Sequence, residues 1–157
     1  MVMKKILMII LLGVYYHVSA QEYKVSAQEY KVEYNSLLDR YEIYDNYGMN
    51  VGYMEYNSLL NRWEVYDNYG QLVKIIEENK LLNRSETYDS YGRQQGYSEF
   101  NKLLQQDEVY DEYGRLKYVK KWNDLLKRWE VYDAYGRMLG YWEYNEWLNQ
   151  WEYHDGY

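Results

Sequence analysis

The chain has 157 residues, a formal net charge of −7, and neither cysteine nor proline. The lack of cysteine excludes disulfides, thiolate metal sites and the lipid-bearing cysteine of a bacterial lipoprotein. The acidic balance argues against a nucleic-acid partner, because phosphate binding needs a basic surface. Aromatic residues make up 20% of the chain, with 24 tyrosines. We therefore expect one domain that is held together by repetition and aromatic packing.

The first twenty residues have the three parts of a secretory signal peptide. Two lysines precede an apolar run that is shorter than the roughly 20 residues a transmembrane helix needs, and Val18-Ser19-Ala20 follows. We therefore predict a signal peptide over 1–20, no stable membrane insertion, and a protein that is secreted, periplasmic or held at the cell surface.

The cleavage position stays open between two alanines. The heptapeptide VSAQEYK occurs twice, so cleavage after Ala20 or after Ala27 fits the pattern, and residues 21–29 form a short N-terminal segment. Cleavage after Ala20 removes two of the 18 basic residues and none of the 25 acidic ones, which leaves 16 against 25 and a formal charge of −9.

Residues 30–157 form six units with a period of 22 residues. The clearest unit is 52–73, GYMEYNSLLNRWEVYDNYGQLV. Such a period is typical of tandem hairpins or of a solenoid, in which each unit buries its apolar face against the next. Three columns do not vary: Asn35, Asn57, Asn79, Asn101, Asn123, Asn145; Glu42, Glu64, Glu86, Glu108, Glu130, Glu152; and Asp45, Asp67, Asp89, Asp111, Asp133, Asp155.

Each unit reads as strand, turn, strand. In YDNYG, Asp67 and Gly70 occupy the first and fourth positions of a type I turn, where Asp caps a backbone N–H and Gly accepts an unusual conformation. The segment 63–66, WEVY, is rich in β-formers. At the other junction, Asn57 starts an Asx-turn, and we expect Leu59 and Leu60 to fold back on the sheet edge.

The fold class we predict is all-β, with six tandem 22-residue hairpin repeats forming one elongated antiparallel meander sheet. Apolar spacings of three and four residues also fit a helix, but the turn signals and the Tyr, Trp and Val content favour strands. A β-solenoid is the alternative. It would stack equivalent acids about 4.8 Å apart, whereas a meander separates them and allows Asn57 to lie opposite Glu64.

Alternation sorts each hairpin onto two faces. Met54, Tyr56, Trp63 and Val65 share the face that we expect to be buried. Tyrosines and acids share the other, a plausible saccharide surface, although tyrosines that merely cover a sheet with no second layer are the favoured interpretation. The candidate ligand-binding residues on it are Tyr44, Tyr66, Tyr88, Tyr110, Tyr132, Glu64, Glu86 and Glu108.

The residues do not favour catalysis or a metal site. Glu55 with Glu64 is the available acid pair, but similar acids recur in every unit rather than in one shaped site. His17 lies in the signal peptide, and His154 occupies the column of Tyr132. An Asp at a turn start is usually a cap rather than a calcium ligand. We expect no catalytic residues, no metal and no cofactor.

Three repeat families share parts of this unit. YDEYGRL at 110–116, YDSYGR at 88–93 and YDAYGRM at 132–138 resemble the YD repeat, which reads Y-D-x-x-G-R-L. The whole unit is similar to the bacterial MORN-type hairpin repeat, and 129–138 is similar to choline-binding cell-wall repeats. The resemblance covers about residues 30–157 and implies hairpins that act as a scaffold or a cell-surface binding module.

Choline-binding repeats hold their ligand between aromatic side chains of neighbouring hairpins. That resemblance implies such a role for Trp63, Trp129 and Trp151, although Ser85 and Asp107 interrupt the column. The Leu-Leu junction and the fixed Asn and Glu depart from all three families.

The expected function is a secreted, non-enzymatic binding or scaffold protein that engages a cell-surface glycan or a partner protein. The alternative is self-association into an extracellular fibre or matrix, because tandem strands without proline present unpaired edges to further chains. The negative charge opposes such edge-to-edge addition.

Overall fold

The computed structural model describes residues 31–45, 47–148 and 150–156. The predicted signal peptide over 1–20 and the segment 21–29 lie outside these residues. Within them, every regular element is a strand, and no helix long and apolar enough to cross a membrane is present. The strands are β1 (Lys31–Asn35), β2 (Arg40–Tyr44), β3 (Asn50–Asn57), β4 (Arg62–Asp67), β5 (Leu72–Asn79), β6 (Arg84–Asp89), β7 (Gln94–Asn101), β8 (Gln106–Asp111), β9 (Leu116–Asn123), β10 (Arg128–Asp133), β11 (Met138–Asn145) and β12 (Gln150–Asp155).

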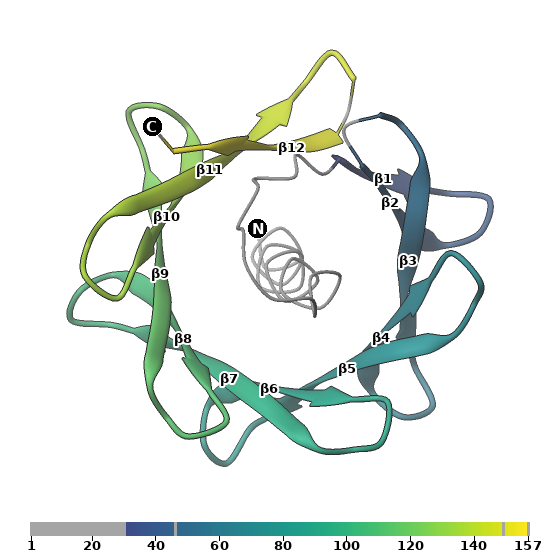
Figure 1. The fold of residues 1–157 in the computed structure, drawn as a ribbon, viewed down its shortest axis with the longest axis horizontal. Coiled ribbons are helices and arrows are strands. Elements are labelled where there is room, and N and C mark those ends of the chain that lie inside the picture. The colour runs from purple at the N-terminus through teal and green to yellow at the C-terminus, as the bar shows by residue number, and fades with distance from the viewer. Residues whose placement is uncertain (1–30, 46, 149, 157) are drawn as a thin grey trace.

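The strands form an antiparallel meander that closes into a barrel (Figure 1). Each strand pairs with its neighbours in sequence, and β1 pairs with β12 through Lys31↔Glu152 and Val32↔Trp151. The predicted all-β hairpin meander is confirmed, whereas the predicted open, elongated sheet is wrong. The solenoid alternative is not supported, because consecutive strands are antiparallel.

Tight turns connect the even-numbered strands to the next odd-numbered strands at one end of the barrel. In the β4–β5 turn, Gly70 N–H donates to the Asp67 carbonyl at 3.1 Å, and Gly70 has φ +78°. The Asp67 carboxylate accepts the backbone N–H groups of Tyr69 at 2.9 Å and Gln71 at 2.8 Å. The predicted Asp cap and turn glycine are confirmed. The five tyrosines exposed here define the tyrosine rim: Tyr47, Tyr69, Tyr91, Tyr113 and Tyr135.

Four-residue loops connect the strands of each hairpin at the opposite end. Asn57 Oδ1 accepts the N–H of Leu60 at 3.1 Å, and Asn61 takes the left-handed conformation at φ 52°. The ladder pairs Asn57 with Arg62 rather than with Glu64, although Asn57 Nδ2 still donates to Glu64 at 3.2 Å.

The loop leucines do not fold back on the sheet edge as predicted. Leu59 is 91% exposed and Leu60 is 50% exposed, because residues 58–61 form the tip of the hairpin beyond the last ladder pair, Asn57↔Arg62. The same exposure recurs in every loop, and the two apolar residues of each loop define the leucine rim: Leu37, Leu38, Leu59, Leu60, Leu81, Leu82, Leu103, Leu104, Leu125, Leu126, Trp147 and Leu148.

A β-bulge between successive hairpins explains why the sheet closes. Between β4 and β5, Val65 pairs with Lys74 while Tyr66 pairs with Leu72, so that Val73 is an extra residue. The same shift occurs at the four other inter-hairpin pairs from β2–β3 to β10–β11. Bulges bend a strand and increase its twist, so one bulge per unit curls the sheet. An even number of strands then brings the first and last together antiparallel.

Alternation along the closed ring sends one set of side chains inward and the other outward. The predicted buried face is confirmed for Met54 and Val65, which are 0% and 2% exposed and belong to one cluster that runs from β1 to β12. Trp63 is partly buried against this cluster, whereas the prediction is wrong for Tyr56, which is 47% exposed because it lies near the open end of the barrel. The outward face carries the paired acids and arginines that are described below. At Gly52, an added Cβ would lie 2.3 Å from the backbone oxygen of Tyr66, so the inner surface needs a glycine there.

Candidate functional site

A layer of cross-strand side-chain pairs lies on the inner face next to the leucine rim. One pair comes from each hairpin, because the ladder places these residues directly opposite one another. The pairs are Tyr34–Tyr41, Tyr56–Trp63, Glu78–Ser85, Phe100–Asp107, Trp122–Trp129 and Tyr144–Trp151. Four pairs are wholly aromatic, and the pair from β5 and β6 is wholly polar.

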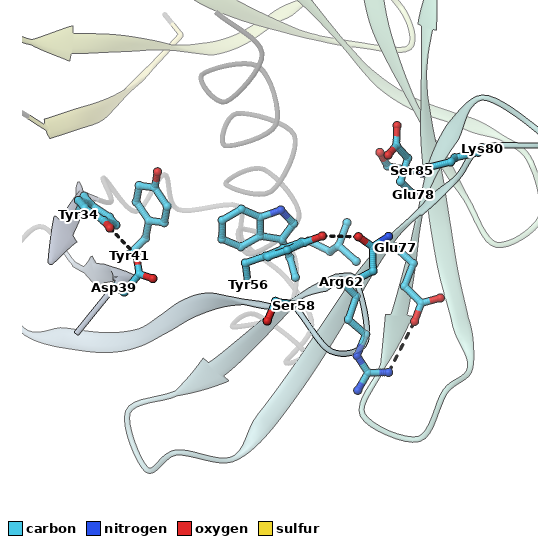
Figure 2. Close-up of a pocket in the computed structure, with 13 residues that line it drawn as sticks. Tyr34, Asp39, Tyr41, Tyr56, Ser58, Arg62, Glu77, Glu78, Lys80 and Ser85 are labelled. Carbon is cyan, nitrogen blue, oxygen red and sulfur yellow. Dashed lines mark hydrogen bonds and ion pairs between the residues drawn. The ribbon is translucent and has the colours of Figure 1, made fainter. Parts of the chain in front are cut away.

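A cavity of about 660 Å³ opens beside this layer at β1 to β6 (Figure 2). Its size lies within the range of roughly 300–1,000 Å³ that is usual for small-molecule sites. The first two hairpins contribute four rings to its lining, and the third contributes the polar pair. The four rings are Tyr34, Tyr41, Tyr56 and Trp63.

The rings form one continuous aromatic wall. The centroid of Tyr41 lies 5.0 Å from that of Tyr34 and 6.0 Å from that of Trp63, and Tyr56 lies 5.3 Å from Trp63. All three contacts are tilted, which is a favourable geometry for aromatic pairs. The four rings therefore act as one apolar surface of the cavity.

Loop residues fix the two outermost tyrosines. The Tyr34 hydroxyl donates to Asp39 at 2.5 Å and the Tyr56 hydroxyl donates to Asn61 at 2.5 Å (Figure 2). The hydrogen bond to Asp39 raises the pKa of Tyr34, with burial adding to the effect, and burial raises the pKa of Tyr41. Both phenols therefore stay protonated at neutral pH, and they remain hydrogen-bond donors.

The polar part of the lining is close to neutral. Three acids line the cavity (Asp39, Glu77 and Glu78), and so do two cations (Arg62 and Lys80). Arg62 contacts Glu77 at 3.6 Å as well as Glu64 on its own strand. Amide and hydroxyl groups of Asn61, Ser58 and Ser85 add neutral donors and acceptors.

The lining offers aromatic rings, hydroxyl and amide groups, carboxylates and cationic side chains. None of the lining residues is a cysteine or a histidine, and among the described residues no group of three or more His, Asp or Glu side chains could hold a metal. Aromatic faces beside hydroxyl, amide and carboxylate groups match an uncharged ligand that has apolar faces and many hydroxyl groups.

The candidate residues predicted from the sequence lie on the outward face, away from the cavity lining. The structure brings them together in pairs: Tyr66, Tyr88, Tyr110 and Tyr132 each donate to the glutamate two residues earlier, at 2.7–2.8 Å. Glu86, for example, also accepts Arg84 at 2.8 Å and Asn79 at 3.1 Å. Tyr44 lies on the same face of β2, where Glu42 instead accepts Arg40 and Asn50 at 2.8 Å.

The pKa shifts on this face follow from the same contacts. The hydrogen bond from Tyr88 lowers the pKa of Glu86 despite its burial, with Arg84 and Asn79 adding to the effect. In return, Glu86 raises the pKa of Tyr88 to about 12. For Glu64 and Glu108, burial raises the pKa but the hydrogen bonds outweigh it, so both pKa values are lowered. The carboxylate oxygens are thus already occupied by donors of the same sheet.

Rings on the outward face also stack on one another. Tyr53 lies parallel to Tyr66 with centroids 4.9 Å apart, and the Arg40 guanidinium lies 3.8 Å above Tyr53. The contact of Arg40 with Tyr53 joins the first hairpin to the second, and the stack of Tyr53 on Tyr66 stabilises the second hairpin itself.

Two lysines that are buried in the structure were not among the residues predicted from the sequence. Lys74 is 4% exposed and Lys120 is 0% exposed, and burial lowers the pKa of each to about 8. Among the described residues, Lys120 Nζ has no hydrogen-bond partner, although Asp107 opposite it favours the charged form. The signal was present in the repeat, because Lys74 stands in the column of Gly52 and Lys120 in the column of Met54.

Trp63, Trp129 and Trp151 were predicted to share a role. They share the inner layer, but only Trp63 lines the cavity. Ser85, which interrupts that column, also lines it, whereas Asp107 does not.

Comparisons with known proteins give a likeness of fold alone. No family model matches the chain, and no curated protein matches it. A solved structure of a protein from Arabidopsis thaliana is similar, with a TM-score of 0.61 over 82% of this chain and 79% of that chain, at 12% sequence identity. The barrel architecture is therefore one that an experimentally solved protein shares.

Proposed function

We propose that the protein is an exported, non-enzymatic binding protein that takes a cell-surface glycan into the aromatic cavity at β1 to β6. The observation that carries this proposal is the wall of four rings beside hydroxyl, amide and carboxylate groups in a space of about 660 Å³. Tyr and Trp rings pack against the apolar faces of sugar rings, while Ser58, Ser85 and the carboxylates of the lining offer hydrogen-bonding groups to the hydroxyls.

The near balance of charge in the lining supports a neutral glycan over a strongly charged ligand. A cationic ligand would meet Arg62 and Lys80, and an anionic ligand would meet Asp39, Glu77 and Glu78. Burial of an unpaired charge beside either set is costly.

The cavity is a better candidate than the outward face. On the outward face, the carboxylates of Glu64, Glu86 and Glu108 already accept two or more hydrogen bonds from their own sheet. A sugar would have to displace these donors, whereas the cavity offers unoccupied volume.

Edge-to-edge fibre formation, the alternative function, has less support. Every strand of the ring pairs on both sides, and a closed ring has no edge that could serve as a template for further strands.

A glycan array of neutral oligosaccharides, followed by calorimetric titration with the best binder, tests the proposal. Trp63→Ala removes the central ring of the wall, so we expect affinity to fall at least about tenfold. Trp122→Ala is the matched control, since Trp122 is in the same layer and 41% exposed but outside the cavity lining. Equal loss with both variants would remove the cavity as the site. If affinity falls only when Tyr66, Tyr88 and Tyr110 are replaced together by Ser, the binding site lies on the outward face instead.

A further inference from the structure

The leucine rim exposes more apolar surface than an isolated barrel needs. The first apolar residue of each loop is 89–96% exposed and the second is 47–57% exposed. At about 60–120 Å² of apolar area for a whole side chain, the twelve residues present about 500–1,000 Å². The six loops that carry this area lie at one end of the barrel, and their summed area is of the size that a stable dimer needs, about 800 Å² from each partner.

The charges on this rim are arranged in opposite halves. Each loop of four residues begins after the fixed Asn, and the loops follow one another around the barrel in strand order. The β11–β12 and β1–β2 loops are neighbours across the β1–β12 pairing and carry Glu146 and Asp39. The β5–β6 and β7–β8 loops lie opposite and carry Lys80 and Lys102.

The two remaining loops have no net charge. The β3–β4 loop has no charged residue, and in the β9–β10 loop Lys127 pairs with Asp124 at 2.8 Å. The arginines that follow several loops are paired to glutamates of their own strands, for example Arg84 with Glu86 at 2.6 Å. The rim as a whole is therefore neutral, with an acidic side and a basic side.

We propose that the leucine rim binds the leucine rim of a second copy of this chain in a two-fold symmetric dimer. A two-fold axis in the plane of the rim, through the β3–β4 and β9–β10 loops, places the β5–β6 loop of one barrel over the β1–β2 loop of the other. Lys80 then faces Asp39 of the second copy and Lys102 faces Glu146, and symmetry repeats both pairs. Lys80 and Asp39 also line the cavity, so the dimer places the cavities of both copies at this interface. The self-complementary contact of an isologous dimer follows from this charge pattern.

The same geometry disfavours two other occupants. A head-to-tail stack would place this neutral rim on the tyrosine rim, where the turn aspartates that recur in every unit outnumber the arginines, so no charge pattern matches. A lipid surface would gain from the leucines but not from the opposed acidic and basic halves.

Sedimentation equilibrium of the full chain tests the dimer. Leu59→Asp lies on the two-fold axis, so each dimer would contain two facing carboxylates, and we expect the dissociation constant to rise at least about thirtyfold. Tyr69→Asp at the opposite rim is the matched control, since Tyr69 is 82% exposed, and it should leave the dimer unchanged.

Charge reversal separates this interface from a merely sticky surface. Lys80→Glu with Lys102→Glu should weaken the dimer at least about tenfold, and adding Asp39→Lys with Glu146→Lys should restore it, because the four changes together reverse both halves. A wild-type chain that is monomeric at all concentrations would overturn the proposal, as would open-ended oligomers that Tyr69→Asp also abolishes. Monomers that bind phosphatidylcholine vesicles through Leu59 would assign the rim to a lipid surface instead.

Discussion

Replacement of Lys120 by Met should stabilise the barrel, and the gain should depend on pH. Lys120 is 0% exposed, and burial lowers its pKa from 10.5 to about 8. One pKa unit corresponds to about 1.4 kcal/mol, so this displacement corresponds to about 3 kcal/mol of destabilisation at pH 7. Met is apolar and has a similar length, so it fills the same space without a buried charge.

The sign of the pH dependence follows from the lowered pKa. Between pH 8 and pH 10.5, the native state has released the Lys120 proton while the unfolded state still binds it, so the wild type becomes more stable as pH rises. The advantage of Lys120→Met should therefore fall by about 3 kcal/mol between pH 7 and pH 10.5. Tyrosine titration affects both proteins equally and cancels in the difference.

Urea unfolding of both proteins at pH 7, 9 and 10.5, followed by tryptophan fluorescence, measures this change. Lys121→Met is the matched control, because Lys121 is exposed and should change stability by less than about 0.5 kcal/mol at every pH. A Lys120→Met advantage that stays constant across the pH range would refute the assignment of the cost to a buried charge. A destabilised Lys120→Met variant would show that the electrostatic attraction of Asp107 outweighs desolvation.

Three other predictions concern the wall of the barrel. Gly52→Ala places a Cβ 2.3 Å from the Tyr66 backbone oxygen and should cost about 3 kcal/mol in urea unfolding, against about 1 kcal/mol for Gly92→Ala, where the space is open. Glu86→Ala should lower the free energy of unfolding by about 1–3 kcal/mol at pH 7. This loss should shrink as pH falls through the lowered pKa of Glu86, since protonation removes the interaction in the wild type. Glu143→Ala, at an exposed glutamate, is the control. Tyr88→Phe should lose less stability than the wild type between pH 10 and pH 12 in alkaline unfolding, because the pKa of Tyr88 is raised to about 12 and its stabilising proton is lost over that range.

The local elements could be predicted from the sequence because their signals are local. Asp67 and Gly70 specify the turn through hydrogen bonds within five residues, and the alternation around Met54 and Val65 follows from the strand period. Closure had no such signal. The extra bulge residue is Val51, Val73, Gln95, Lys117 or Leu139 in successive units, so no residue type marks it. From β3 onwards, each odd-numbered strand is longer than the even-numbered strands with which it pairs. The constant 22-residue period gives no sign of this difference.

The candidate site was only partly predictable for the same reason. Tyr66, Glu64 and Asn57 were correctly placed on one face, but the sequence did not show that Tyr66, Asn57 and Arg62 all donate to Glu64, which leaves its carboxylate occupied. The interruption at Ser85 was visible in the repeat. The sequence could not show that Ser85 lines a cavity, because the cavity forms only when the sheet closes into a barrel and this inner layer becomes concave.

The β1–β12 pairing has a consequence for how the molecule opens. Each of the other neighbouring pairs of described strands is connected by a turn or a four-residue loop, whereas strand pairing alone holds β1 beside β12. Separation of β1 from β12 breaks one ladder and leaves every turn intact, so this seam is the place where the ring separates first. Amide hydrogens of Val32 and Trp151 should then exchange ahead of those in β5 to β8, and the aromatic cavity beside β1 acquires a lateral entrance each time the seam parts.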